Sequence, residues 1–143
     1  MLKLHELKSV IMKNILLLIF SILVLSLSNS CKKVEGTGGG ATIKGIIQEQ
    51  KYNALGNIIA EYPGSDQDVY LIYGTADQFY DDDVKTSYDG SFMFKYLQKG
   101  TYTIFVYEDD ATKPSGKNVI KETFDITEKG QIIDLDTINI RKI

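Results

Sequence analysis

The chain has 143 residues, with 16 Lys and Arg, 19 Asp and Glu, and a net charge of −3. Since basic residues do not dominate, the composition excludes a nucleic-acid-binding protein of the usual basic kind. A chain of this length can bury one core of ordinary size, with no room for a second large domain. Cys31 is the only cysteine, which excludes disulfides within the chain.

Residues 1–30 predict an export signal. Met12–Ser30 begins with a basic residue, Lys13, and continues with Ile15–Leu27, a run of 13 residues of which 11 are apolar. A membrane-spanning helix needs about 20 apolar residues, so this run favours a cleaved signal over a permanent span. Translation is expected to start at Met1 or at Met12, where the better-shaped signal begins.

The apolar run leads directly to the single cysteine. Leu27-Ser28-Asn29-Ser30-Cys31 resembles a lipobox, the signal for lipid attachment, in the looser form that Bacteroidota lipoproteins carry. The resemblance implies diacylglycerol on the Cys31 thiol and signal cleavage between Ser30 and Cys31. Two or more acyl chains hold a protein firmly on a bilayer. The alternative is an ordinary secreted protein with a free thiol.

The residues after Cys31 bear on the final location. Lys32 and Lys33 follow the cysteine, without the aspartate that retains lipoproteins in the inner membrane and without a dense acidic run. By resemblance to known sorting rules, this favours the outer membrane, facing the periplasm or the cell surface. Four glycines among residues 35–40 predict that residues 31–40 form a flexible tether.

From residue 41 to residue 143 the apolar pattern repeats every two residues, which predicts an all-β domain. Seven strands are expected, at residues 42–50, 68–73, 84–88, 91–96, 101–108, 118–126 and 131–140. A short additional strand is left open at 57–60. The alternation predicts these inward-facing side chains: Val69, Leu71, Tyr73, Phe92, Phe94, Tyr96, Tyr102, Ile104 and Val106.

Two segments of this domain carry a family resemblance. Thr86-Ser87-Tyr88-Asp89-Gly90-Ser91-Phe92-Met93-Phe94 and Leu97-Gln98-Lys99-Gly100-Thr101-Tyr102 resemble the carboxypeptidase regulatory-like and Cna-B-like domains. The resemblance implies a seven-stranded Greek-key β-sandwich of the transthyretin-like (prealbumin-like) kind. The matching residues are structural, so they carry no function across.

This sequence contains few candidate catalytic residues. The only histidine, His5, lies within the leader, and Cys31 is assigned to the lipid. This removes Ser-His-Asp and Cys-His nucleophiles and most zinc sites from the mature part. We therefore expect a protein that is not an enzyme and has no cofactor besides the covalent lipid.

Acidic residues gather in two loops before and after the expected strand at 68–73. Calcium prefers six to eight oxygen ligands, so these carboxylates are candidates for a calcium site, although their spacing matches no known calcium loop. The alternative is solvated charge that keeps strand edges from pairing. The candidate residues are Asp66, Asp68, Asp77, Asp81, Asp82 and Asp83.

Aromatic residues accompany the second acidic loop. Tyr73, Phe79 and Tyr80 are candidates for stacking on sugar rings, with half-buried sheet positions as the alternative. A third alternative is an internal Lys–Asn isopeptide bond between Lys44 and Asn139, with Glu108 as the helping acid, as in some Cna-B-like domains.

Two classes of function therefore compete. The favoured one is a lipid-anchored, non-catalytic envelope module that binds a protein partner or supports an assembly, for example by strand addition at a sheet edge. The rival is a ligand-binding lipoprotein that uses its acidic and aromatic loops for calcium or carbohydrate.

Overall fold

The structure is a computed structural model that describes residues 12–15, 17, 35–75 and 79–143. The chain separates into two compact units, residues 1–32 and 33–143. Residues 12–15 and 17 are helical, and no helix in the described part of the chain is long and apolar enough to span a membrane. Ser30 and Cys31, the expected cleavage and lipidation residues, lie outside the described residues.

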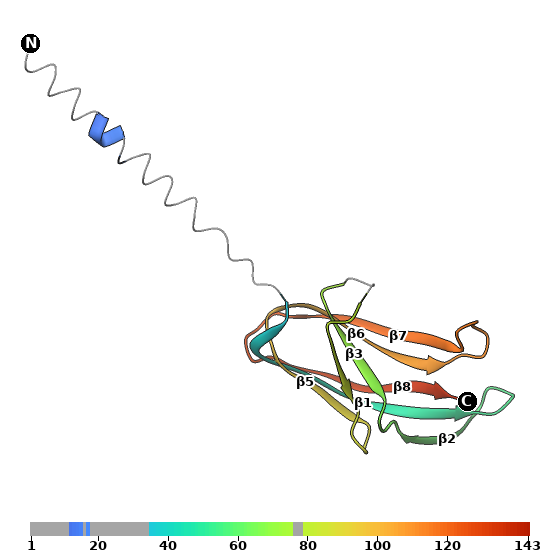
Figure 1. Ribbon diagram of the computed structural model, residues 1–143. Coiled ribbons are helices and arrows are strands. Elements are labelled where there is room, and N and C mark those ends of the chain that lie inside the picture. Colours follow the sequence, from blue (N-terminus) through green and yellow to red (C-terminus); the bar gives the residue numbers. More distant parts are fainter. Residues whose placement is uncertain (1–11, 16, 18–34, 76–78) are drawn as a thin grey trace, which may run out of the picture. The chain divides into compact units, whose positions relative to one another are not determined.

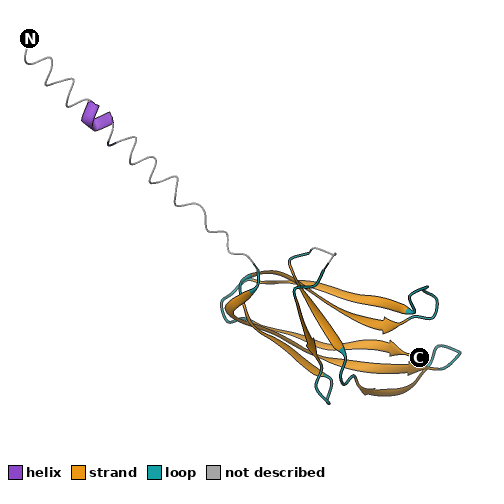
Figure 2. Ribbon diagram, in the orientation of Figure 1, coloured by secondary structure: helices purple, strands orange, loops and turns teal. Residues whose placement is uncertain are grey.

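The second unit is an all-β sandwich, as the alternating pattern predicted (Figures 1 and 2). Its described residues form these strands: β1 Thr37–Tyr52, β2 Ile58–Pro63, β3 Asp68–Tyr73, β4 Asp82–Lys85, β5 Ser91–Leu97, β6 Gly100–Asp109, β7 Lys117–Ile126 and β8 Ile132–Lys142. The additional strand left open near 57–60 is therefore present as β2. Strand β4 ends at Lys85, earlier than expected, because the Thr86 hydroxyl bonds to the Gly64 carbonyl and the Gln67 amide and holds a turn there.

Strand β1 organises the first sheet. It pairs antiparallel with β5 along its first half and with β2 along its second half, and parallel with β8 on its other edge. The second sheet is antiparallel throughout, in the order β4-β3-β6-β7. The β1–β2 turn, the β6–β7 turn and the C-terminus lie at one end of the sandwich (Figure 1).

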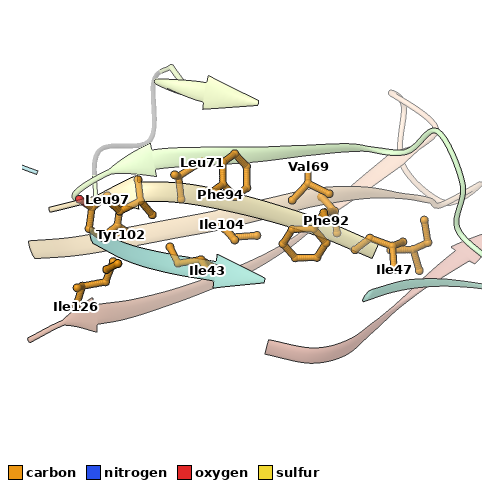
Figure 3. Close-up of a cluster of buried hydrophobic side chains, with 13 residues drawn as sticks. Ile43, Ile47, Val69, Leu71, Phe92, Phe94, Leu97, Tyr102, Ile104 and Ile126 are labelled. Carbon is orange, nitrogen blue, oxygen red and sulfur yellow. The ribbon is translucent and has the colours of Figure 1, made fainter. Parts of the chain in front are cut away.

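The core lies between the two sheets, and inward side chains at every second position fill it (Figure 3). The expected inward residues of β3 and β6 are buried, apart from Tyr73, which is partly buried and packs against the core. Burying one such side chain contributes about 1.5–3 kcal/mol. The core members are Ala41, Ile43, Ile47, Val69, Leu71, Phe92, Phe94, Leu97, Tyr102, Ile104, Val106, Ile126 and Ile140.

Tyr96 departs from the expected alternation. It was predicted to face inward with Phe92 and Phe94, but it is 69% exposed and has a φ of 61°. The pairing explains this difference, since β5 advances three residues from Phe94 to Leu97 while β1 advances two, from Ile43 to Ala41. The extra residue makes a β-bulge that turns Tyr96 outward and places Leu97 in the core.

The glycine-rich segment also differs from expectation. Strand β1 begins at Thr37, so residues 37–40 belong to the sheet and not to a tether. A Cβ atom on Gly39 would lie 1.9 Å from the Leu97 carbonyl oxygen. Just before the strand, the Gly36 amide donates to the Tyr102 hydroxyl at 2.9 Å, and the Gly36 carbonyl accepts from the Gln98 amide at 2.8 Å. These glycines therefore permit a close backbone approach between β1 and the β5–β6 turn.

This packing distinguishes two neighbouring glycines. Gly39→Ala is expected to destabilise the fold by about 1–3 kcal/mol or more, because its methyl group would overlap the Leu97 backbone. Gly40→Ala is the matched control, since its methyl group would meet only Gly130 atoms at an ordinary 3.7 Å. Urea denaturation of both variants measures the difference, and equal stability would show that this segment is not packed as described.

Candidate functional site

Aromatic side chains gather on the solvent side of the second sheet. In β6 the inward residues Tyr102, Ile104 and Val106 alternate with Thr103, Phe105 and Tyr107, which point to the other face. In β3, Tyr70 lies on that outer face, directly opposite Phe105. The same alternation that builds the core thus places three rings outside it.

The rings form a connected group, here called the aromatic cluster: Tyr70, Tyr80, Phe105 and Tyr107. The rings of Tyr70 and Phe105 stack, with centroids 4.8 Å apart and planes 14° apart. Tyr107 lies edge-on to both, at 5.8 Å from Tyr70 and 5.7 Å from Phe105. Tyr80, from the β3–β4 connection, tilts against Tyr70 at 4.7 Å. Such pairs contribute about 0.5–1.5 kcal/mol each beyond burial, so they fix the rings in place.

The cluster remains open to solvent. Tyr107 is 44% exposed and Tyr80 is 50% exposed, while Tyr70 and Phe105 are half-buried between their neighbours. Exposed rings that are already packed against one another lose little conformational freedom when a ligand covers them. The cluster therefore presents a set of packed aromatic rings to solvent.

Tyr107 separates two shallow depressions. One, of about 260 Å³, is lined by Gln67, Asp68, Tyr70, Tyr107 and Lys117. The other, of about 300 Å³, is lined by Ile72, Phe105, Tyr107, Val119 and Lys121. Three of the five lining residues of the first, here called the polar depression, carry a charge or an amide, and three of the five lining residues of the second are apolar. Both depressions expose polar and apolar atoms in similar amounts.

Ion pairs hold the charged groups at the polar depression. Lys117 bonds to the Asp109 carboxylate, and Asp68 lies 3.1 Å from the Lys85 ammonium. The hydrogen bond from Lys117 holds the pKa of Asp109 below its usual value. Burial, and then the nearby negative charge of Asp68, raise the pKa of Tyr70 above its usual value.

Among the aspartates expected to bind calcium, the five that the structure describes do not gather at one point. Asp66 and Asp68 both pair with Lys85, at 3.3 Å and 3.1 Å. At the opposite end of β3, the Asp81 carboxylate accepts the Tyr73 amide at 2.7 Å. Asp82 and Asp83 follow in β4, and the Asp82 carboxylate accepts the Asp83 amide, while Asp77 lies outside the described residues. Across the described ranges, no three carboxylate, histidine or cysteine side chains are placed to hold a metal ion.

The three residues expected to stack on sugars lie in different environments. The Tyr73 ring packs on Tyr102, with centroids 5.8 Å apart, at the core side of β3. Phe79 is exposed, and no ring contact links it to the cluster in the described part of the chain. Only Tyr80 belongs to the cluster. Tyr70, Phe105 and Tyr107 were missed, although their positions between inward-facing neighbours in the pattern mark them as outward aromatic residues.

Lys44 lies in two other candidate regions, a larger depression and the expected isopeptide arrangement. A depression of about 560 Å³ is larger, but its lining includes three lysines, Lys44, Lys85 and Lys95, and the Lys44 ammonium is paired with Asp134 at 2.7 Å. The isopeptide arrangement does not form, since Lys44 is engaged by Asp134 and Asn139 lies opposite Gln48 in the sheet. The Glu108 carboxylate instead accepts hydrogen bonds from Asn118 and from the Arg141 amide.

The Asp109–Lys117 pair makes stability depend on pH. Because the folded state lowers the pKa of Asp109, its contribution is present above about pH 4 and is lost as pH falls through that lowered pKa. Asp109→Asn is therefore expected to unfold about 0.5–1 kcal/mol more easily at pH 7 and to match the natural chain near pH 2. Thermal melts across this range test it, and a gap that stays constant with pH would mean that charge is not the cause.

Comparisons with known proteins give limited guidance. No family model and no curated protein matches the chain. Among solved structures, a proposed carbohydrate-binding protein from Pseudomonas aeruginosa is similar, with 14% identity, a TM-score of 0.45, and coverage of 79% of this chain and 92% of the other. An (S)-allantoin synthase is also similar, with 10% identity, a TM-score of 0.38, and coverage of 73% of this chain and 42% of the other.

Proposed function

We propose that this protein is a lipid-anchored, non-catalytic binding module of a bacterial cell envelope, and that the aromatic cluster is its binding surface. The observation that carries the binding function is the group of four packed rings on the solvent side of the second sheet. The lipobox-like segment that ends at Cys31 supports the anchor, and Lys32 and Lys33 favour the outer membrane.

A binding role accounts for the cluster better than a purely structural one. The core between the sheets is complete without these rings, since the buried cluster of side chains draws on other residues. Aromatic residues, tyrosine above all, are enriched at recognition surfaces because they offer a large apolar area together with a polar hydroxyl group. The cluster therefore adds aromatic contact area on a face outside the core.

The nature of the accessible groups supports a non-catalytic role. The polar groups beside the cluster are an amide, a paired carboxylate and a paired ammonium, from Gln67, Asp68 and Lys117. Hydrogen bonding and positioning are what such groups supply, while a nucleophile and an adjacent base are what catalysis of acyl transfer would require.

The anchor is tested by metabolic labelling with an alkyne-bearing fatty acid. The natural chain is expected to carry the label and to sediment with membranes, and Cys31→Ser to lose both properties, because the thiol is the attachment point. Tyr88→Ala is the control, since Tyr88 is exposed in the β4–β5 turn and its replacement leaves residues 27–31 unchanged. Label retained by Cys31→Ser, or absent from the natural chain, would overturn the anchor.

The binding surface is tested by mild iodination, which modifies accessible tyrosines. In the purified protein both Tyr107 and Tyr88 are expected to react, because both are exposed. In isolated cell envelopes Tyr107 is expected to react more slowly relative to Tyr88, which lies in the β4–β5 turn away from the cluster. Mass spectrometry of the two tyrosine peptides gives this ratio. An unchanged ratio would mean that nothing in the envelope covers this face.

A further inference from the structure

We infer that the two depressions beside Tyr107 bind an uncharged oligosaccharide, with one sugar unit on each side of the Tyr107 ring. This inference rests on the proposed binding function and names its ligand class. The site differs from the loop first expected to stack on sugars, because its rings come from the outward positions of β3 and β6.

The polar depression fits a ligand with many hydroxyl groups. Asp68 supplies carboxylate acceptors, Lys117 supplies ammonium donors, and the Gln67 amide supplies both. Each charged group is already held by an opposite charge, Asp68 by Lys85 and Lys117 by Asp109, so both side chains are fixed in position before a ligand arrives. Sugar hydroxyls donate to carboxylates and accept from ammonium groups, so both side chains match such a ligand.

The two signs of charge at this rim disfavour a strongly charged ligand. A polyanion would be repelled by Asp68, and a polycation would be repelled by Lys117 and Lys121, which border the two depressions. A neutral polyol meets neither penalty. The Tyr70 phenol also lines this depression and is an uncharged hydrogen-bonding group.

The second depression fits the other side of a sugar, its face of C–H groups. Ile72, Phe105 and Val119 provide an apolar floor and walls, and the Tyr107 ring bounds it on the side of the first depression. A pyranose ring is amphipathic in the same way, with C–H groups on its faces and hydroxyls at its rim. Each depression combines polar groups with apolar surface beside the Tyr107 ring, since Lys121 also lines the second, and this pair of amphipathic depressions matches two linked sugar units.

The size and composition of this face favour a glycan over a protein partner. A stable protein interface buries about 800 Å² on each side around an apolar centre depleted of Lys and Asp. Here Asp68 lies on one side of Tyr107, and Lys117 and Lys121 project from β7 close to the rings. The apolar area is a narrow strip with charges along it, which suits a chain of sugar rings.

The experiment measures binding of the full lipidated chain, in mild detergent, to an array of soluble oligosaccharides at least four units long. The neutral set holds β-1,3-glucan, β-1,4-glucan, mannan, xylan and chitin fragments, and the charged set holds alginate and hyaluronan fragments. Binding within the neutral set is expected, with affinity weakened at least about tenfold by Tyr107→Ala. Tyr88→Ala, which removes a tyrosine that is 89% exposed in the β4–β5 turn, is the matched control and should bind normally.

A second variant and a folding check keep the result decisive. Tyr107→Phe keeps the ring and removes the hydroxyl, so it should retain most of the affinity, and thermal melts of all variants exclude unfolding as the cause. A blank array, binding only to the charged set, or equal binding by Tyr107→Ala would each overturn the inference. If the array is blank while Tyr107 is still protected in cell envelopes, the binding surface stands and its ligand is of another class, such as a protein.

Discussion

The position of Tyr102 in β6 determines both faces of the second sheet. Its ring is fully buried, and its hydroxyl bonds to the Gly36 amide and to the carbonyls of Gly36 and Gln98. Because side chains alternate along a strand, a shift of one residue would exchange the faces of β6. The hydroxyl accepts from the Gly36 amide and shares its one hydrogen between two backbone carbonyls, and these contacts oppose that shift. Ile104 and Val106 therefore complete the core, and Phe105 and Tyr107 are held on the outside.

The same strand also fixes the charged end of the sandwich. Beyond Val106 the inward position of β6 is taken by Glu108, whose carboxylate accepts the Asn118 side chain and the Arg141 amide. Asp109 accepts the Ile143 amide and pairs with Lys117. These contacts join β6 to β7 and to the end of β8, and they place the Lys117 ammonium beside the aromatic cluster. The positioning of the proposed ligand site thus depends on the packing at this end of the fold.

Alternation in the sequence was sufficient to predict the sandwich and most of its core. It succeeded in β3 and β6, where every second residue is apolar and no irregularity intervenes. It failed at Tyr96, because the β-bulge in β5 depends on the pairing with β1 and leaves no mark in the local pattern. It failed at residues 37–40 as well, because the sequence does not distinguish a glycine that permits close backbone contact from a glycine in a flexible tether.

The candidate site was harder to predict than the fold. The aspartates near β3 are close together in the sequence, which suggested one site. In the structure Asp66 and Asp81 lie near opposite ends of β3, and Lys85 forms ion pairs with Asp66 and Asp68. Conversely, Tyr70 and Phe105 are 35 positions apart in the chain and meet only because β3 and β6 pair. Outward aromatic residues were visible in the pattern, but their assembly into one cluster required knowledge of which strands are neighbours.

An exposed aromatic face favours self-association of the protein, and features of the sheet edges oppose strand pairing between copies. Strand β4, at one edge of the second sheet, is only four residues long and begins with two aspartates. In the first sheet, Asp136 has a φ of 51° beside a register shift in the pairing of β8 with β1, which interrupts a regular edge. Short, charged and irregular edges oppose strand pairing between copies. At its β4 border, the sheet that carries the cluster therefore resists strand addition, which favours recognition of a ligand across the face of the sheet over strand pairing at that edge.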